Sequence, residues 1–586
     1  MFILGINCFH GDSSACLISN GILLAAAEEE RFRRVKHWTG FPSKSIQYCL
    51  EEAGISLSQV NHIAINQDPK ANLGRKISYA LHGQFSLRLI IDRLRNKVKR
   101  LNILQNCVKS FPDDFFSGRV HQIEHHLAHV SSAFYASPYD EAVVVSVDGF
   151  GDFSSTAWGF GKGVSIRVDG KVYFPHSLGI FYQALTQFLG FNDYGDEYKV
   201  MGLAPYGNPS LMSEMHELVS LLPDGSFELN LKYFCHHNQE VNYEWESGSP
   251  SVGCLFSSKL EELLGPPRKK GEDLTQRHKD IAHSVQLMYE EAFFHLLNAL
   301  YERYNSCSIA LAGGCAMNSV ANGKISLRTP FKNIYVQAAA GDAGGAIGAA
   351  LNVWHKAGGS LAKVRSVAHD HAYWGPSFTN EQIEEVLNQC VIDIEKEGCV
   401  FEKVNKLNTL LYDTAKSISD GHVVGWFQGR MEWGPRALGN RSILCDPRRS
   451  DMKDILNLKI KRRESFRPFA PSILREAVPA WFDQDGDVPF MMQVYKINQE
   501  KQNLIPAVTH NDGSGRLQTV YEHTNPRFYH LISTFRDLTG VPIILNTSFN
   551  ENEPVVCTPK EALSCFLRTK MDRLIMGDWV IQRTLR

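Results

Sequence analysis

Short apolar runs bounded by turn residues predict several strands at the start of the chain. Residues 2–7 and 14–19 are strand-like, and Asn20-Gly21, the preferred two-residue hairpin turn, joins the second run to a third at residues 22–24. A helical pattern then leads to a fourth strand-like run at residues 60–65. The chain therefore opens as a mixed α/β domain.

A related pattern restarts near residue 141. Residues 142–147 form a Val-rich run that is typical of a buried strand, Asp148 closes it, and another strand-like run follows at residues 155–159. Two such halves around a cleft are what an actin/hexokinase-like nucleotide-binding fold contains. The two halves share a hydrophobic pattern and not amino-acid identities. From this pattern we predict an actin/hexokinase-like fold for the N-terminal part of the chain.

The alternation of helices and strands continues beyond this repeat. An amphipathic helix is predicted over about residues 280–304, followed by a strand at residues 308–311. Residues 358–375 lose the apolar period and contain Gly-Gly and Trp-Gly-Pro, which is typical of a linker. At 586 residues the chain exceeds what one hydrophobic core usually supports, so we expect two domains, 1–358 and 359–586.

The overall composition argues against several classes of protein. A net charge of −2 argues against a general binder of nucleic acid or membrane surfaces, and no run of eighteen apolar residues is present to span a membrane. The thirteen cysteines include no CxxC pair and the first residues carry no basic leader, so we expect reduced thiols and a cytoplasmic location. The basic, helical segment 66–115 is expected to be a solvated accessory face.

Two histidines and two acidic residues form a candidate metal site. His125 and His129 are four residues apart, so on a helix they share one face and can hold the same ion. Asp148 at the end of its strand and Asp342 in a glycine-rich turn are candidate carboxylate ligands. The same histidine spacing also occurs by chance in surface and core positions, so from spacing alone both interpretations stand.

A basic stretch of unusual composition lies in the second domain. Between Arg430 and Arg467 the chain carries eleven Lys or Arg residues against five acidic residues, with Gly, Pro and Trp between the charges. A solvated helix face would instead alternate Lys and Glu. Arginines held by turn residues suit a pocket for a phosphorylated substrate or nucleotide, because the planar guanidinium matches phosphate geometry. A nucleic-acid strand fits less well, because aromatic stacking platforms are not interleaved in series.

Two later motifs belong with this basic stretch. Residues 513–519 place Arg516 in a flexible loop, and a strand over residues 541–545 ends in the polar loop 546–550, whose hydroxyl and N–H groups can donate to an oxyanion. Each motif alone is more often an ordinary turn. Beside the basic stretch, both become candidates for the same anion pocket.

These motifs together resemble the NodU/CmcH family of O-carbamoyltransferases, whose known members modify antibiotics such as tobramycin, cephamycin, novobiocin and geldanamycin. The likeness covers nearly the whole chain. Its markers are His10 and residues 12–15, 28–32, 124–129, 146–149, 177–182, 199–207, 311–318, 341–342, 434–439, 467–471 and 546–550. Tyr198 and Asn552 stand where some relatives have glycine, and neither replaces a proposed catalytic group.

The resemblance implies two linked active sites. An N-terminal TsaD-like domain of the ASKHA (actin/hexokinase-like) fold would carry out transfer, and a C-terminal YrdC-like α/β domain would form carbamoyl-adenylate from carbamoyl phosphate and ATP, with Mg²⁺. Lys461 and Arg516 would act in catalysis. The residues expected to hold carbamoyl phosphate and the triphosphate are Arg436, Lys461, Arg467, Arg516, Asn546 and Ser548.

In the transfer domain, the resemblance assigns an iron-type ion to the four metal candidates. The ligand set suits Fe²⁺, Mn²⁺ and Zn²⁺ about equally. His10 would be the general base for the acceptor hydroxyl, although without the family a hydrogen-bonded turn histidine is an equal interpretation. The residues that would approach the adenine nucleotide are Gly313, Gly314, Asn318, Gly344 and Gly345.

The predicted function is an ATP-dependent O-carbamoyltransferase that acts on a small hydroxylated acceptor, such as a natural product or a sugar. A tRNA threonylcarbamoyl-type transferase is one alternative, which the near-neutral charge disfavours. A non-catalytic actin-like ATP-binding scaffold is the other, and it would leave the arginines without a purpose. The acceptor and the oligomeric state stay open, a homodimer being the commonest soluble assembly.

Overall fold

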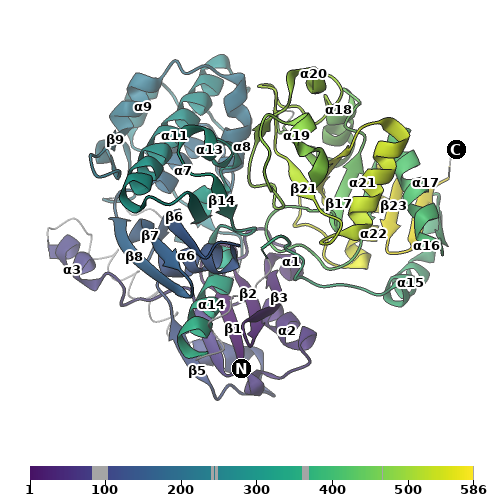
Figure 1. Ribbon diagram of the computed structural model, residues 1–586, viewed down its shortest axis with the longest axis horizontal. Helices are drawn as coiled ribbons and strands as arrows, with labels where there is room; N and C mark the ends of the chain where they lie inside the picture. The colour runs from purple at the N-terminus through teal and green to yellow at the C-terminus, as the bar shows by residue number, and fades with distance from the viewer. Residues whose placement is uncertain (82–102, 239–242, 245–247, 359–368, 465, 585–586) are drawn as a thin grey trace. The chain divides into compact units, whose positions relative to one another are not determined.

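The computed structural model describes residues 1–81, 103–238, 243–244, 248–358, 369–464 and 466–584. These residues form two compact units, Met1–His369 and Asp370–Arg586 (Figure 1). The predicted domain boundary after residue 358 falls at the start of the segment 359–368, which lies outside the described residues.

The first sheet of the N-terminal unit has the strand order β3-β2-β1-β4-β5 within the described residues. Its strands are β1 (Phe2–Asn7), β2 (Ser14–Ser19), β3 (Ile22–Glu28), β4 (His62–Ile65) and β5 (Arg119–Gln122). β1, β2 and β3 pair antiparallel, whereas β4 and β5 continue from β1 in parallel. Asn20 and Gly21 both have positive φ between β2 and β3, which confirms the predicted hairpin turn.

The second sheet repeats this arrangement, with the order β14-β13-β6-β7-β8 within the described residues. Its strands are β6 (Glu141–Gly151), β7 (Ser154–Lys162), β8 (Ser165–Tyr173), β13 (Ser308–Ala312) and β14 (Asn333–Val336). Here β6 takes the place of β1: its antiparallel neighbours follow on one side and its parallel neighbours on the other. Two sheets with one strand order and one set of directions confirm the predicted actin/hexokinase-like fold.

Two helices lie between the sheets of this unit and position three of the candidate metal ligands. One helix carries His125 and His129, and Asp342 lies in the turn directly before the other. Helix α6 (His125–Ala136) packs on β6 and β13, helix α14 (Gly345–Ala357) packs on β1, β2 and β4, and the two helices pack on each other. Their close approach needs glycine, because a Cβ at Gly348 would lie 1.8 Å from the carbonyl oxygen of Ala128. The small residues of α14 therefore determine how closely the helices approach.

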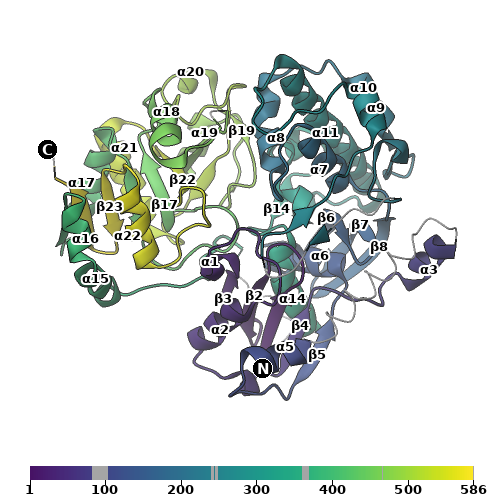
Figure 2. The ribbon, with the colours of Figure 1, turned by 180° about the vertical axis from the view of Figure 1, so that it is seen from behind.

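A group of helices covers the other side of the second sheet (Figures 1 and 2). They are α7 (Leu178–Phe188), α8 (Glu197–Leu203), α9 (Met212–Leu218), α10 (Ser258–Leu264) and α11 (Gln276–Tyr304). Helix α11 contacts α7, α8 and α9, and it is the helix predicted over 280–304. It begins four residues earlier because Thr275 and His278 form a capping box at its N-terminus.

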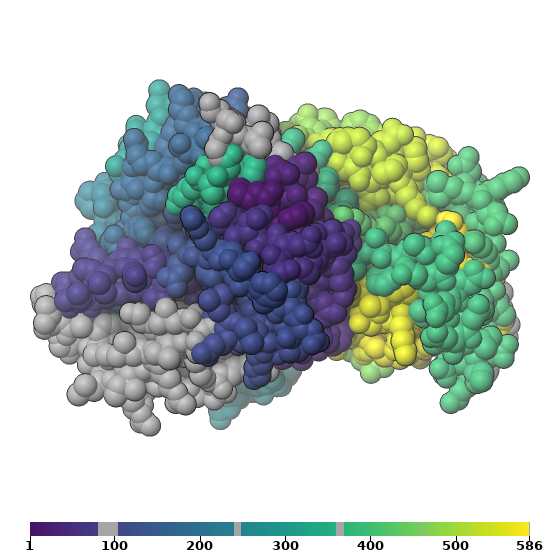
Figure 3. Space-filling model, turned by 90° about the horizontal axis from the view of Figure 1, so that it is seen from below, coloured from purple at the N-terminus to yellow at the C-terminus, as the bar shows by residue number. Residues whose placement is uncertain are grey.

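The segment 66–115 lies partly outside the described residues. Helices α3 (Leu73–Leu81) and α5 (Ile103–Ser110) are described, and residues 82–102 are not. Leu104, Val108 and Phe115 are exposed. Figure 3 shows the side of the molecule on which the violet to blue N-terminal segments reach the surface. The predicted solvated face is therefore less uniformly polar than its basic composition indicated.

The C-terminal unit is an α/β domain built on one mixed sheet, with the order β15-β24-β23-β16-β17-β22-β18-β21 within the described residues (Figure 2). Helices α17 (Leu407–Ser419) and α21 (Pro526–Thr539) pack together, and α22 (Pro559–Arg568) packs on β16 and β23. The α/β class is as predicted, and the YrdC-like assignment stays a prediction. The strands are β15 (Cys399–Lys403), β16 (Val424–Phe427), β17 (Arg441–Cys445), β18 (Ala470–Leu474), β21 (Gln518–Val520), β22 (Ile543–Ser548), β23 (Arg573–Met576) and β24 (Trp579–Arg583).

Two local predictions in this unit were wrong. The polar residues 546–548 do not form a loop: they lie in β22 and pair with β17, with Asn546 opposite Leu444. Arg516 does not lie in a loose loop but in the two-residue link between β20 (Ser514–Gly515) and β21, and it is half-buried. In both places sheet pairing overrides the local preference of Gly, Ser and Asn for turns.

Among the helices of the described part of the chain, none is both long enough and apolar enough to cross a membrane.

Candidate functional site

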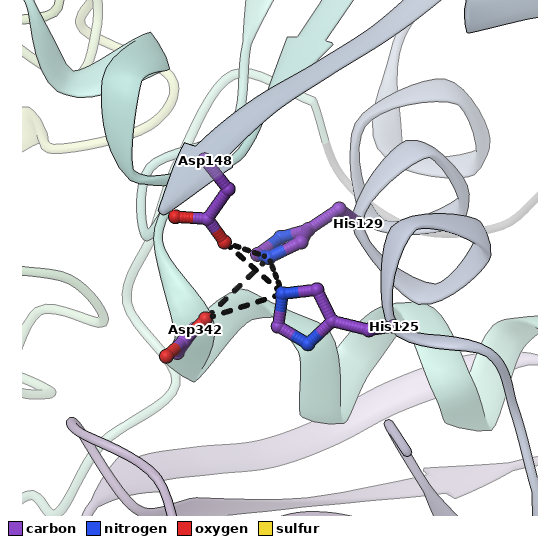
Figure 4. A group of neighbouring side chains, drawn as sticks. All are labelled: His125, His129, Asp148 and Asp342. Carbon is purple, nitrogen blue, oxygen red and sulfur yellow. Dashed lines mark hydrogen bonds and ion pairs between the residues drawn. The ribbon is translucent and has the colours of Figure 1, made fainter. Parts of the chain in front are cut away.

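The four predicted metal ligands converge in the N-terminal unit (Figure 4). The Nε2 atoms of His125 and His129 each lie 3.0 Å from Oδ2 of Asp148 and 3.6 and 3.5 Å, respectively, from Oδ1 of Asp342. The two Nε2 atoms are 3.1 Å apart, and the four ligand atoms all lie within 4.8 Å of one another. Both histidines are buried.

Separate elements position these side chains. The histidines occupy successive turns of α6, whose N-terminus is capped by Glu124 through a 2.8 Å bond from the Leu127 N–H to its carboxylate. Asp342 lies in a single 3₁₀ turn directly before α14. Asp148 was expected at a strand end, but β6 continues past it, and the pairing of β6 with β7 shifts between Val147 and Gly151. That irregularity follows from the extra residues on β6 and places the Asp148 carboxylate beside α6.

Backbone groups hold the ligands in place. Oδ1 of Asp148 accepts bonds from the N–H groups of Gly149 (2.8 Å) and Gly314 (3.1 Å), which leaves Oδ2 to face the histidines. Oδ2 of Asp152 accepts from the His125 N–H at 2.9 Å, and Gly151 lies against the His125 ring, where a Cβ would come within 2.0 Å. Sequence reasoning did not select Asp152; its only signal is its place in the polar turn after Gly151.

The electrostatics of this centre favour ionised carboxylates. Burial opposes ionisation, but hydrogen bonds from both histidines hold the pKa of Asp148 well below its usual range. Burial and the charge of Asp148 likewise oppose ionisation of Asp342, whose pKa is nevertheless lowered to about 2 by the neighbouring histidines. Burial alone would lower the pKa of His129, but Asp148 and Asp342 raise it to about 9.

The donor set fits a divalent transition metal. Two imidazole nitrogens and two carboxylate oxygens suit Fe²⁺, Mn²⁺ or Zn²⁺. Oδ1 of Asp342 is buried and accepts no hydrogen bond within the described residues, as expected for an oxygen that serves a cation. Within the same residues Nδ1 of His125 and of His129 has no hydrogen-bond acceptor, so no second carboxylate orients these rings, and the His125 ring packs against Gly151.

His10 also lies at this centre. Its Nδ1 is 3.8 Å from Oδ2 of Asp342, and its ring stacks on that of His125 with the centroids 5.7 Å apart. The side chain is 13% exposed, and its Nε2 is buried. The structure therefore brings the predicted base to the predicted metal ligands.

The glycines expected at the nucleotide have close contacts with the protein itself. The Gly314 N–H bonds Asp148, as described above, and Gly313 has a φ of 92° with no room for a Cβ, which would lie 2.2 Å from the carbonyl oxygen of Val147. A Cβ at Gly345 would lie 2.3 Å from Nδ2 of Asn66. These contacts explain the glycines through packing, and their nucleotide role stays a prediction.

The other two nucleotide candidates have comparable positions. Gly344 is the residue before α14, and a Cβ there would lie 2.1 Å from the carbonyl oxygen of Ala339. Oδ1 of Asn318 accepts from the Ala321 N–H at 3.1 Å and caps helix α12 (Ser319–Gly323). Asn318 thus has a structural role as a helix cap, and its contact with a nucleotide stays a prediction.

In the C-terminal unit, arginines gather around Arg516. Burial and the charges of Arg436, Arg463 and Arg467 lower the pKa of Arg516 well below its usual range. Its Nε–H is buried and donates to no acceptor among the described residues. Like charges held together in this way favour the binding of an anion, and the anion site stays a prediction. Arg463 was not selected from the sequence, although it belongs to the basic run 461–463.

Asn546 links two of these arginines. Its buried Nδ2 donates to the carbonyl oxygen of Ala437, next to Arg436, at 3.2 Å and to Oε1 of Gln518, two residues after Arg516, at 3.1 Å. Asn546 therefore positions the cluster through its neighbours along the chain.

Lys461 and Ser548 meet at a second point in this unit. The Lys461 ammonium is buried and donates to the Ser548 carbonyl (2.6 Å) and to the carbonyl and Oδ1 of Asn550 (both 2.7 Å). The Ser548 hydroxyl donates to Oδ1 of Asn550 at 2.8 Å. Asn550 was missed as a partner; its signal was its place in the motif 546–550.

Comparison with known families identifies the chain. The model of the carbamoyltransferase N-terminus matches residues 2–351, and that of the carbamoyltransferase C-terminus matches residues 415–583. The chain belongs to the carbamoyltransferase family. The candidate metal ligands of this carbamoyltransferase lie in the first matched segment and its arginine cluster in the second.

Two relatives of this carbamoyltransferase match nearly its whole length, and a third matches about half of it. An uncharacterized protein of Synechocystis sp. is 42% identical over 99% of this chain and 97% of its own. Nodulation protein NolNO of Sinorhizobium fredii is 37% identical over 98% of this chain and 80% of its own. The 3'-hydroxymethylcephem-O-carbamoyltransferase of Amycolatopsis lactamdurans is 30% identical over 47% of this chain and 48% of its own.

Proposed function

We propose that this carbamoyltransferase uses carbamoyl phosphate and ATP to carbamoylate a hydroxyl group of a small molecule. The observation that carries the proposal is the cluster of arginines around Arg516, whose mutual repulsion a bound anion would relieve. The hydroxyl acceptor is supported by the similarity to an enzyme whose name specifies a hydroxymethyl cephem.

In the C-terminal unit the arginines would neutralise the phosphates of both substrates. Water cleaves carbamoyl phosphate to carbamate and phosphate, and a carbamate oxygen then attacks the α-phosphorus of ATP. The bond to the β-phosphate breaks, which gives carbamoyl-adenylate and pyrophosphate. Arg436, Arg467 and Arg516 would bind the phosphoryl oxygens, and Mg²⁺ is expected with the triphosphate.

Lys461, Asn546 and Ser548 would support this step, as the family resemblance implies. Lys461 is bonded to Ser548 and Asn550 in the structure, so it reaches a substrate only by exchanging one of these bonds. Asn546 would hold the two arginines at their spacing, because its amide joins the segments that carry them.

In the N-terminal unit the carbamoyl group would pass to the acceptor. A divalent ion, of which Fe²⁺ is expected in this family, would supply Lewis-acid charge to the phosphate of the adenylate when held by His125, His129, Asp148 and Asp342. His10 would take the proton of the acceptor hydroxyl while its oxygen bonds the carbamoyl carbon, and AMP leaves. The location of His10 beside Asp342 supports this role. The turns at Gly313 and Gly344 would approach the adenylate.

The adenylating half can be tested without knowing the acceptor. Purified full-length protein with ATP, Mg²⁺ and carbamoyl phosphate is expected to release pyrophosphate, and Lys461→Ala and Arg516→Ala are expected to abolish this release. Arg536→Ala is the control, since Arg536 lies on α21 and bonds its neighbour Asp537. Pyrophosphate release that does not depend on carbamoyl phosphate would contradict the proposal.

A further inference from the structure

The loop that leads into Arg516 carries a histidine whose protonation is set by its neighbours. The Ser514 hydroxyl donates to Oδ1 of Asp512 at 2.6 Å, so the one hydroxyl proton of Ser514 is used there. Nδ1 of His510 lies 3.2 Å from the same hydroxyl oxygen and can contact it favourably only as a donor. The proton of the His510 ring is therefore on Nδ1, and Nε2 presents a lone pair.

This lone pair lacks a donor. Nε2 of His510 is buried and has no hydrogen-bond partner among the residues that the structure describes. Burial, helped by Arg516 and Lys453 and opposed by Asp512, lowers the pKa of His510 to about 4, so the ring is neutral near pH 7. A buried acceptor without a donor is costly, and the cost is recovered when a ligand N–H or O–H reaches it.

Packing ties this loop to the arginine cluster. The His510 N–H bonds the Ser514 carbonyl at 2.8 Å and closes the turn that leads to Arg516. On the other side, the Lys453 ammonium donates to the Thr509 carbonyl at 2.6 Å, and Arg463 donates to Oδ1 of Asn457 at 3.2 Å. Lys453 lies in helix α18 (Met452–Leu456), and Asn457 lies in the turn after it. The two residues are four positions apart, so they share one face.

The arginine cluster and the acceptor Nε2 of His510 together indicate the chemistry of the ligand. Guanidinium groups bind a phosphate, and an acceptor near them binds a group with a hydrogen to donate. Carbamoyl phosphate has a phosphate and an NH₂ group on one small molecule, whereas acetyl phosphate has the same shape with a methyl group in place of NH₂.

We propose that Nε2 of His510 accepts a hydrogen bond from the NH₂ group of carbamoyl phosphate and so makes the arginine site specific for carbamoyl over acyl phosphates. The proposal rests on the proposed function for the identity of the substrate. It goes beyond that function by naming the residue that distinguishes the substrate from its isosteres. His510 contacts no reacting bond in this role, and it acts by specificity alone.

Binding measured by calorimetry on the full chain tests this role. The ligands are carbamoyl phosphate, acetyl phosphate and sulfate, of which sulfate reports on the arginines because it carries no hydrogen. His510→Asn keeps an N–H toward Ser514 but removes the acceptor at the Nε2 position, and His510→Gln places an amide oxygen near that position. Thermal unfolding of each variant checks that the loop is intact.

The wild-type protein is expected to bind carbamoyl phosphate on the order of 10- to 100-fold more tightly than acetyl phosphate. In His510→Asn this ratio should fall to about one, with sulfate binding unchanged, and His510→Gln should restore part of it. An unchanged ratio in His510→Asn, or no preference in the wild type, would overturn the inference. If the protein prefers carbamoyl phosphate over acetyl phosphate but releases no pyrophosphate, the proposed adenylation is rejected and the role of His510 is still supported.

Discussion

The backbone N–H of Gly314 donates to Oδ1 of Asp148 over 3.1 Å, although the two residues are 166 positions apart in the chain. Gly314 belongs to the turn after β13, and Asp148 is part of β6, the neighbouring strand. The parallel pairing of these strands therefore places a backbone donor behind a candidate metal ligand and orients the carboxylate toward α6.

Replacing Gly314 should disturb this orientation. In Gly314→Ala the new Cβ would lie 2.9 Å from Oδ1 of Asp148, so the carboxylate must shift, and we expect metal affinity to fall roughly 10- to 100-fold. Gly149→Ala is the matched control, since Gly149 bonds the same oxygen and its Cβ would meet nothing within 4 Å among the described residues. Metal competition against a chelator measures both. Equal affinities in the two variants would contradict the prediction.

The adjacent histidines should differ in their effect on metal content. His129→Asn removes a ligand that points at Asp148, and we expect the purified protein to lose bound transition metal. His126 is equally buried, but its Nδ1 lies 2.9 Å from the Ser146 hydroxyl, and His126→Asn keeps a donor there. Elemental analysis after dialysis should find metal in His126→Asn and not in His129→Asn. Loss from both variants would mean that helix packing, and not ligation, was disturbed.

Removing Arg516 should stabilise the protein while it abolishes anion binding. Arg516→Met takes a half-buried, repelled guanidinium out of the cluster, and we expect the free energy of unfolding without anions to rise by about 1–3 kcal/mol. Sulfate should raise the melting temperature of the wild type and leave that of Arg516→Met unchanged.

Arg441→Met is the contrasting variant for this experiment. The Arg441 guanidinium is buried and donates to the carbonyls of Gln428 (2.8 Å) and Pro376 (2.9 Å). Its loss leaves the Gln428 carbonyl without this donor and leaves the Pro376 carbonyl with the Met431 N–H alone among the described residues, so we expect destabilisation by about 2 kcal/mol or more. Destabilisation of similar size in Arg516→Met would show that the Arg516 guanidinium is structural.

His10 should separate the two half-reactions. His10→Asn is expected to slow carbamoyl transfer to an acceptor by about 10²- to 10⁴-fold, because the base beside Asp342 is lost. Pyrophosphate release that depends on carbamoyl phosphate should continue, because the arginine cluster is unchanged. Parallel loss of both activities would argue against a role of His10 confined to transfer.

The ion pair of His37 and Asp12 should make stability depend on pH. Burial lowers the pKa of His37, but Asp12, whose Oδ1 lies 2.7 Å from Nδ1, raises it to about 9, above the ordinary value of 6.5. The native state therefore binds a proton that the unfolded chain releases between these values, so the contribution is complete below pH 6.5 and lost as the pH rises through 9.

Urea unfolding at pH 6, 7.5 and 9 measures this dependence. The wild type should lose more stability than His37→Gln over this range, because the amide does not titrate. Parallel decline of the two proteins with pH would contradict the assignment of this dependence to His37.

Much of the fold follows from local patterns along the chain. The strands at 2–7 and 14–19, the Asn20-Gly21 turn and the long helix that ends at Tyr304 lie where periodicity predicted them, because period and turn chemistry act within a few residues. The histidine spacing within α6 is of the same kind. A pattern of such short range cannot show that Asp342 reaches the same point. The glycine-rich turn made Asp342 a candidate ligand, and the family resemblance strengthened that prediction.

The missed residues have no local signal. Asp152 acts through one bond to the His125 N–H, Asn550 through its bonds with Lys461, and Arg463 through its position among other arginines. Asn546 and Ser548 were placed in a loop because their side chains favour turns, whereas pairing with β17 puts them in a strand. Contacts between distant segments decided each of these cases.

The sequence by itself determined which residue types were available and where the helices and strands with a clear local pattern lie. It also made an anion and a metal the expected ligands. Only the tertiary structure decided that Oδ1 of Asp148 is held by Gly149 and Gly314 so that Oδ2 faces the histidines. It also decided the contacts of Ser514 with Asp512 and His510 from which we infer the protonated nitrogen of His510. The physical reason is that periodicity reports which face of an element is buried, whereas a hydrogen bond depends on distances and angles that only packing between elements sets.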